Sequence, residues 1–129
     1  MFQQALTGRE VRLGPDHHNT LRTVHGLADV FHREGNFEES ERLYNRALKG
    51  LEKQLGKDHP KTLAVVEKLA TNCLSQRNYE MAETLFIRTL NGRLQRLGRS
   101  HPDTLQTNDK LTSMYKDLGR DWNAQALHD

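Results

Sequence analysis

Three histidines near the N-terminus recur every seven residues, and their spacing is the first feature of the sequence that suggests chemistry. They are His18, His25 and His32. A helix rises about 10.5 Å over seven residues, whereas a zinc–nitrogen bond is only about 2.0 Å long. One ion therefore cannot bind two of these histidines. We expect polar histidines on the protein surface and no metal site.

Nucleophilic catalysis has little support in the sequence. Cys73 is the only cysteine, and it lies on an apolar helical stripe, where a small buried hydrophobic side chain is the expected role. The chain has no P-loop, no dinucleotide-binding glycine motif, no zinc-protease motif and no nucleophile elbow. We therefore predict that the protein is not an enzyme and needs no cofactor.

The composition narrows the remaining function classes. The chain has 129 residues, of which 35% are hydrophobic and 28% are charged, and its net charge is +2. So small an excess of positive charge disfavours binding to nucleic acid or to anionic membranes by bulk charge. The sequence has no apolar stretch of membrane-spanning length, and its N-terminus lacks the apolar run of a signal peptide. We expect a cytoplasmic protein.

A repeat of 42 residues organises the chain. Leu-Gly-Pro-Asp-His at 13–17 recurs as Leu-Gly-Lys-Asp-His at 55–59 and as Leu-Gly-Arg-Ser-His at 97–101. Other columns keep this register, including one of leucines at 27, 69 and 111. We predict a single repeat domain spanning residues 1–129. Its parts are the end of a preceding second helix at 1–12, repeat 1 at 13–54, repeat 2 at 55–96 and an incomplete repeat 3 at 97–129.

Each repeat is expected to contain two amphipathic helices. In residues 20–34 apolar side chains recur every three or four positions, which is typical of a helix with one buried stripe. Gly35 and Asn36 end this helix, and a second stripe with the same period covers residues 37–54. No alternation at period two indicates a strand. Paired helices at a fixed period stack into an all-α solenoid, in which each pair buries its stripe against its neighbours.

The turn between repeats has its own sequence signals. Asp58 or His59 can cap the following helix, and Pro60 suits a first helical turn because its missing N–H costs nothing there. We therefore expect a structural role for His17, His59 and His101, which occupy the same column at the start of each first helix.

Two segments resemble tetratricopeptide repeats. They are Leu-Ala-x2-Phe-x3-Gly-x-Phe-x2-Ser at 27–40 and Leu-Ala-x2-Cys-x5-Tyr-x2-Ala at 69–82. The usual unit of this family has about 34 residues. The 42-residue spacing, the Leu-Gly-x-Asp-His-Pro-x-Thr-Leu turn and Ala-Glu-Thr-Leu-Phe-Ile-Arg-Thr-Leu at 82–90 are similar to the kinesin light chain subtype. That subtype also occurs in repeat arrays of fungal receptors built on a nucleotide-switch core. The resemblance implies a right-handed α-solenoid over essentially the whole chain.

Three positions depart from the family pattern. Cys73 stands where the other repeats carry an aromatic residue, which predicts looser packing in the middle repeat. Arg77 replaces the glycine that ends the first helix elsewhere, so we expect a different turn geometry there. Asp121 replaces the aromatic residue of the last turn and Trp122 follows it. We expect Trp122 to pack in its place, and the alternative is an exposed contact residue.

The face beside the apolar stripe of each first helix is the candidate binding surface. A rotation of about 100° per residue brings the same columns of all three first helices onto this face. In the tetratricopeptide family this face lines a concave groove that grips extended peptides or partner helices, so the resemblance implies a peptide-binding site. The candidate residues are Arg22, His25, Asp29, His32, Arg33, Glu67, Thr71, Leu74, Gln106, Asp109, Ser113 and Lys116.

The charges on this face favour one kind of ligand. Glu67 and Asp109 in the middle of the array disfavour a C-terminal carboxylate, which carboxylate-clamping repeats bind. The first repeat is cationic and the later repeats are more acidic, so a peptide of mixed charge is expected to place its acidic end on the first repeat. We expect Glu67→Lys and Asp109→Lys to weaken binding of such a peptide and Arg88→Glu to have little effect.

The predicted function is a protein–protein interaction module within a larger scaffold, cargo adaptor or sensor. Its partner is a protein or peptide, with no role for nucleic acid or a membrane. The alternative is a structural segment that forms homo-oligomers through its ends, the stub at Met1–Arg12 and the region near Trp122. We expect those ends to expose apolar faces, because no polar-faced capping helix is visible in the sequence.

Overall fold

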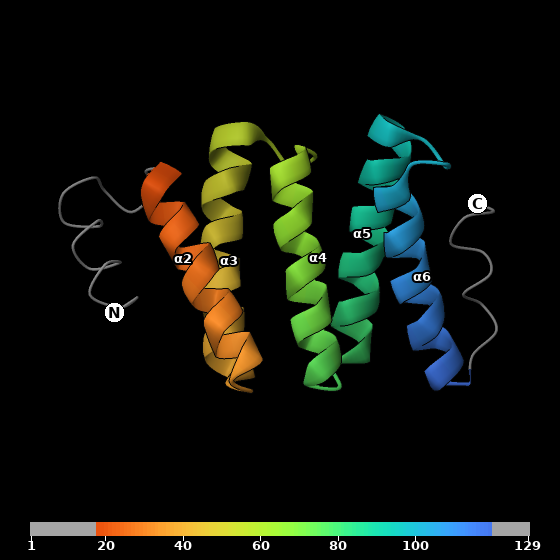
Figure 1. Cartoon of the computed structure of the whole chain (residues 1–129), viewed down its shortest axis with the longest axis horizontal. Coiled ribbons are helices and arrows are strands. Elements are labelled where there is room, and N and C mark those ends of the chain that lie inside the picture. Colours follow the sequence, from red (N-terminus) through yellow and green to blue (C-terminus); the bar gives the residue numbers. More distant parts are fainter. Residues whose placement is uncertain (1–17, 120–129) are drawn as a thin grey trace.

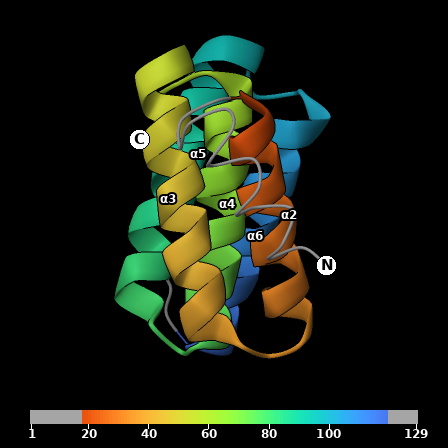
Figure 2. The same ribbon diagram turned by 90° about the vertical axis from the view of Figure 1, so that its left-hand side faces the viewer.

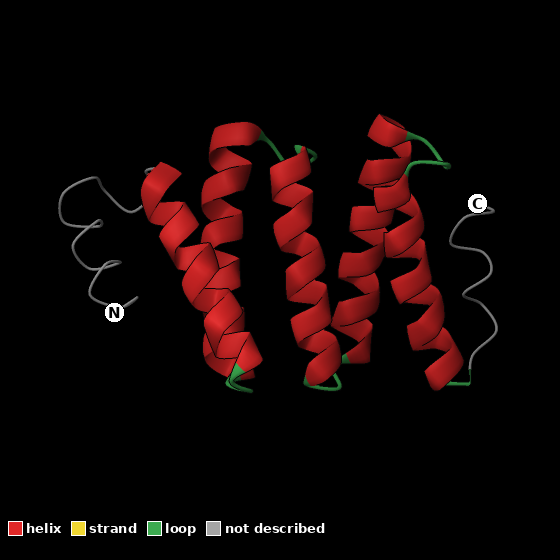
Figure 3. Ribbon diagram, viewed as in Figure 1, coloured by secondary structure: helices red, strands yellow, loops and turns green. Residues whose placement is uncertain are grey.

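The computed structural model describes residues 18–119, which form five α-helices (Figure 1). No strand occurs in this part of the chain (Figure 3). The first helices begin 42 residues apart, and so do the second helices, which confirms the predicted all-α solenoid. The helices are α2 (His18–Arg33), α3 (Phe37–Leu55), α4 (Pro60–Ser75), α5 (Tyr79–Leu97) and α6 (Pro102–Asp117).

Each helix packs against the next one along the chain. The hairpins α2–α3 and α4–α5 stand side by side, and α6 follows them (Figure 1). The view turned by 90° shows α3 and α5 on one side, with α2 and α6 on the other (Figure 2). A helical hairpin cannot bury its apolar stripe alone, so the contacts between neighbouring hairpins supply much of the stability.

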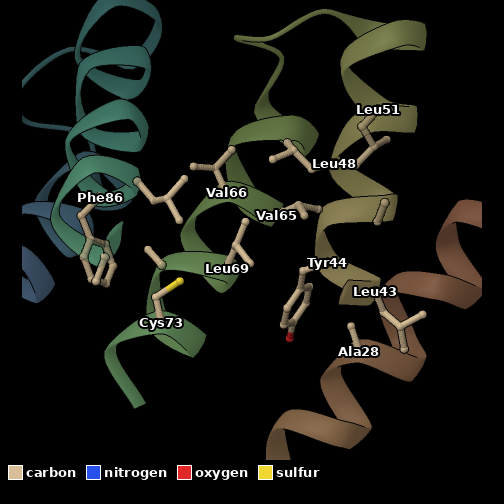
Figure 4. Close-up of a cluster of buried hydrophobic side chains, with 14 of the residues drawn as sticks. Ala28, Leu43, Tyr44, Leu48, Leu51, Val65, Val66, Leu69, Cys73 and Phe86 are labelled. Atoms are coloured by element: carbon tan, nitrogen blue, oxygen red, sulfur yellow. The ribbon is translucent and has the colours of Figure 1, made fainter. Parts of the chain in front are cut away.

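The predicted stripes meet in one continuous core. The leucines that share a column, Leu27, Leu69 and Leu111, are 5%, 3% and 0% exposed. Figure 4 shows Leu69 of α4 between Tyr44 of α3 and the neighbouring α5. Cys73 also belongs to this core and is 1% exposed. The looser packing expected around its small side chain stays a prediction.

Histidines begin the first helices, as the sequence predicted. The Nδ1 atom of His59 accepts a hydrogen bond of 3.0 Å from the backbone N–H of Lys61, and His101 accepts one of 3.1 Å from Asp103. A proline follows each histidine in the first helical turn. These bonds satisfy a backbone donor that has no partner within the helix. His17 lies outside the described residues.

The turn at Arg77 has the same geometry as the glycine turns, so the expectation of a different geometry was wrong. The φ angle of Arg77 is 62°, against 83° for Gly35. In both turns a backbone N–H reaches five residues back, from Asn78 to Cys73 and from Asn36 to Phe31, at 2.9 Å. This hydrogen bond closes the helix end through a left-handed residue. The hairpin therefore imposes the conformation whichever residue occupies the position.

Replacing Arg77 by glycine is expected to stabilise the protein by about 0.5–1 kcal/mol. A left-handed conformation costs an L-residue about 1–2 kcal/mol, and the extra freedom of glycine in the unfolded chain offsets part of that gain. Urea denaturation measures the change, and the reverse variant Gly35→Arg is the matched control, expected to lose a similar amount. A lower urea midpoint for Arg77→Gly would contradict the assignment.

Candidate peptide-binding groove

Three hollows lie along the face of the first helices and together form the groove. The first hollow, of about 500 Å³, lies between the N-terminal halves of α2 and α4. The central hollow, of about 370 Å³, lies between the C-terminal half of α2 and the middle of α4, and extends to Lys110 of α6. The last hollow, of about 330 Å³, lies between α4 and α6. Their volumes lie within the range of about 300–1,000 Å³ that is usual for ligand pockets in proteins.

The structure gathers eleven of the twelve candidate residues around these hollows. Only Lys116, which is exposed on α6, lines none of the three. Arg22 and His25 line the first hollow; Asp29, His32, Arg33, Glu67 and Thr71 line the central hollow; and Leu74, Gln106, Asp109 and Ser113 line the last hollow.

Sequence analysis missed three lysines of the groove. Lys61 lines the first hollow, Lys68 the central hollow, and Lys110 both the central and the last hollow. Lys68 and Lys110 share a column of the repeat, so their recurrence 42 residues apart was a signal that could have found them.

Charge changes sign along the groove. The first hollow is lined by Arg22 and Lys61 and by no acidic residue. Neither side chain has a hydrogen-bond or ion-pair partner among residues 18–119. The last hollow is lined by Asp109 and Asp117, with Lys110 beside them. A ligand in the groove therefore meets unpaired positive charge at one end and an excess of negative charge at the other.

Asp29 links the first two repeats across the central hollow. Its carboxylate accepts a hydrogen bond from the Tyr44 hydroxyl and two from Lys68 Nζ, at 3.0 and 3.1 Å. Partial burial disfavours the charge of Asp29. The hydrogen bonds from Tyr44 and Lys68 and the proximity of His25 outweigh that effect and lower the pKa of the Asp29 carboxyl. The charge of Asp29 is thus already engaged before any ligand binds.

His25 is half-buried, so its placement as a polar surface histidine was wrong. Its Nε2 atom is buried, has no hydrogen-bond partner in the described part of the chain, and lies 3.7 Å from an Asp29 oxygen. The ring stands edge-on to Tyr44, with 5.9 Å between centroids. Burial lowers the pKa of His25, Asp29 opposes the shift, and Lys68 adds to it. The folded protein therefore favours the neutral imidazole.

The buried His25 is expected to make stability depend on pH. Its pKa lies below 6.5 in the folded chain and at about 6.5 in the unfolded chain, so the unfolded chain takes up the proton first. Its contribution to stability is therefore lost as the pH falls through 6.5 toward the lower pKa of the folded state.

His25→Leu removes this titration and replaces the imidazole with an apolar side chain that suits its apolar surroundings. Urea denaturation between about pH 7.5 and 5.5 compares the two proteins in the range where histidine titrates. We expect wild type to lose stability more steeply than the variant as the pH falls. Parallel curves for the two proteins would refute the role given to His25.

Glu67 is not an open contact for a ligand, contrary to the sequence-based expectation. It is buried, and one carboxylate oxygen accepts hydrogen bonds from Arg93 Nη1 at 3.0 Å and from the Thr107 hydroxyl at 2.9 Å. Lys110 lies 3.6 Å from its other oxygen. Glu67, Arg93 and Thr107 form what we call the Glu67 cluster, which joins α4, α5 and α6. Its negative charge is neutralised internally, so repulsion of a ligand carboxylate does not follow from it.

The two junctions between repeats differ in chemistry although they share one register. The α4–α6 junction holds the Glu67 cluster. Moving back 42 residues from each member of the cluster gives His25, Leu51 and Val65 at the α2–α4 junction. The ion pair and hydroxyl of the α4–α6 junction thus correspond to an imidazole among apolar side chains at the α2–α4 junction. This difference explains why Nε2 of His25 has no partner among residues 18–119.

The described residues give no support to other chemistry. Burial, with a smaller effect of Glu41, raises the pKa of the Cys73 thiol to about 11, so the reactive thiolate is scarce at neutral pH. Between residues 18 and 119, no three His, Cys, Asp or Glu side chains lie close enough together to hold a metal ion. Every helix in that range is too short or too polar to be a membrane span.

Comparison with known proteins identifies the repeat family. The profile of the tetratricopeptide repeat family matches residues 1–53 and, in a second overlapping placement, residues 24–91. The chain belongs to the tetratricopeptide repeat family. Proteins with this repeat are in general non-enzymatic scaffolds for protein–protein interaction. No curated protein sequence matches this repeat array significantly.

Solved structures with similar repeats cover nearly the whole array. A putative kinesin light chain from Podospora anserina, described as having nearly identical TPR-like repeats, is 23% identical with a TM-score of 0.81, and the match covers 98% of this chain and 61% of that one. BtubC (BKLC) from P. vanneervenii is 24% identical with a TM-score of 0.86, over 97% of this chain and 50% of that one. The array spans between half and about three fifths of the length of these proteins. At this identity they show the fold alone.

The predictions about the chain ends concern residues outside the described range. Met1–Arg12, Asp121 and Trp122 are among them. Self-association through the ends, the packing of Trp122 and the division of the chain into repeats at the stated boundaries therefore stay predictions.

Proposed function

We propose that the groove binds an extended peptide segment of a partner protein. The observation that carries the proposal is the row of three hollows along the first helices, which accommodates successive side chains of one extended strand. Repeat arrays use such elongated surfaces for binding. The protein is then an interaction module, and its place in a larger cytoplasmic scaffold, adaptor or sensor is part of the same proposal.

The preferred peptide carries acidic residues at one end and basic residues at the other. Arg22 and Lys61 attract carboxylates at the first hollow, and Asp109 and Asp117 attract basic side chains at the last hollow. Exposed charges of this kind set the orientation and the association rate more than the affinity. We expect a dissociation constant in the micromolar range, which corresponds to about −8.2 kcal/mol.

The placement of Glu67 changes the choice of test variants. Glu67→Lys would disrupt the Glu67 cluster, and Arg88→Glu would break the 2.6 Å ion pair between Arg88 and Glu52. Both substitutions alter the folded structure and report poorly on binding. Arg22→Glu and Asp109→Lys instead change exposed side chains at the two ends of the groove.

Selection of peptides from a random display library on the whole chain, followed by fluorescence anisotropy, tests the proposal. We expect Arg22→Glu and Asp109→Lys each to weaken binding about fivefold, which is about 1 kcal/mol and typical of an exposed charge pair. Lys49→Glu, an exposed reversal on α3 away from the hollows, is the matched control and should leave binding unchanged.

Charge-swapped peptides separate a specific contact from a general field. A peptide whose acidic end is made basic should bind Arg22→Glu better than wild type. Selected peptides that bind wild type, both groove variants and the control equally well would overturn the groove assignment, and so would a library that yields no binder.

A further inference from the structure

Asn72 is a buried polar residue in a column that is otherwise apolar. Its side chain is 0% exposed, and the same column holds Val30 in the first repeat and Met114 in the third. A buried carboxamide is costly unless its donor and acceptor are both satisfied. Asn72 therefore requires hydrogen-bond partners, which the apolar residues in the same column of the other two repeats do not need.

The hydrogen bonds of Asn72 fix the tautomer of His32, that is, which ring nitrogen carries the hydrogen. The Nδ2 atom of Asn72 donates to the backbone oxygen of Phe37 at 2.9 Å. Its Oδ1 atom therefore faces His32 Nδ1, at 2.8 Å. Because Oδ1 can only accept, the hydrogen of that bond belongs to Nδ1 of His32. The ring also stands edge-on to Phe37, with 5.3 Å between centroids, which holds its orientation.

The other ring nitrogen of His32 is then an acceptor available to a ligand. In a neutral imidazole only one nitrogen carries a hydrogen, so Nε2 presents a lone pair. His32 lines the central hollow, and Nε2 is neither buried nor bonded to any side chain of the described residues. The ring of His32 is half-buried, with Nδ1 engaged by Asn72 and Nε2 exposed.

The other charged side chains of the central hollow supply mainly hydrogen-bond donors. Arg33, Lys68 and Lys110 line it with positive charge. Its two carboxylates already accept hydrogen bonds, Asp29 from Tyr44 and Lys68, and Glu67 from Arg93 and Thr107. Asp29 offsets one of the three cations, whereas the charge of Glu67 is already neutralised by Arg93. A carboxylate ligand can pair with the remaining cations but cannot donate to Nε2 of His32, whereas a carboxamide can accept from the cations and also donate to Nε2.

We propose that His32 selects a carboxamide side chain, Asn or Gln, of the bound peptide in the central hollow. The amide nitrogen donates to Nε2 of His32, and the amide oxygen accepts from the cationic side chains that line the hollow. Asn72 is the positioning residue, because it holds the hydrogen on Nδ1. This inference rests on the proposed peptide groove and adds the chemical identity of one ligand residue.

The tautomer of His32 can be measured without a ligand. Long-range imidazole ¹H–¹⁵N correlation at about pH 8, where histidines are neutral, should show wild-type His32 with its hydrogen on Nδ1. Asn72→Met, which places the residue of the third repeat at this position, should release that preference. A hydrogen on Nε2 in wild type would overturn the proposal.

Peptides from the display selection test the ligand preference. In each peptide, every Asn and Gln is replaced by Asp or Glu, and binding is measured at about pH 8. We expect one position at which the replacement weakens binding to wild type about tenfold, since one hydrogen bond is lost and a lone pair opposes the new charge.

Two variants keep this result interpretable. His32→Phe retains the ring packing against Phe37 but has no acceptor, and Asn72→Met retains the imidazole without fixing its hydrogen. Both should reduce the tenfold discrimination to less than about twofold while the affinity for carboxylate peptides persists. Binding peptides without a discriminating position would overturn the role of His32 alone. A library without binders would overturn the groove, and this inference with it.

Discussion

Replacing Arg93 by leucine is expected to lower the free energy of unfolding by about 3 kcal/mol. Removing one partner of a buried ion pair typically costs about 3–5 kcal/mol, because the other charge is left without compensation. The Arg93 and Glu67 side chains are 11% and 10% exposed. The value is at the low end of the range because Thr107 and Lys110 still contact the Glu67 carboxylate. Urea denaturation followed by circular dichroism measures the loss.

The first repeat junction supplies the control for this experiment. The triple variant Glu67→His, Arg93→Leu, Thr107→Val reproduces at the α4–α6 junction the set found at the α2–α4 junction. Because it removes both charges together, it should recover most of the stability that Arg93→Leu loses. A single variant as stable as wild type, or a triple variant less stable than the single one, would contradict the role assigned to the Glu67 cluster.

Truncation of Leu69 to alanine is expected to cost about 2–5 kcal/mol, the range for large-to-small changes in a packed core. Leu69 is 3% exposed and belongs to the core cluster shared by α3, α4 and α5 (Figure 4). The middle repeat packs against both neighbours, so a cavity there weakens two interfaces at once. Thermal and urea unfolding should both show the loss.

Leu105→Ala is the matched control for Leu69→Ala. Leu105 is 45% exposed on α6, and exposed substitutions usually change stability by less than about 0.5 kcal/mol. An unchanged midpoint for Leu69→Ala, or an equal loss for both variants, would show that the core assignment is wrong.

The fold was predictable because its signals are local and repeated. The spacing of apolar residues over one repeat indicates two helices, and the helix bounds expected from it, 20–34 and 37–54, lie within two residues of α2 and α3. Recurrence after 42 residues then fixes the remaining helices without further information. Which residues share the groove face follows from helical geometry alone.

The chemistry of the groove was less predictable because it depends on distant partners. Glu67 lies on the expected face, but Arg93 and Thr107, which neutralise it, are 26 and 40 residues away. His32 reaches Asn72 across the same distance of 40 residues. A sequence pattern shows the face of one helix, whereas the charge available to a ligand depends on side chains contributed by its neighbours.

The second helices of the array are longer than the first helices, with 19 residues against 16. Three residues extend a helix by about 4.5 Å, and the ends of α3 and α5 carry Leu55 and Leu97, which are both exposed. One edge of the array therefore bears an apolar step once per repeat, on the layer opposite the hollows. Each added repeat would add one more exposed leucine to this edge. The apolar area of the edge would therefore grow with the number of repeats, independently of the side chains that line each groove.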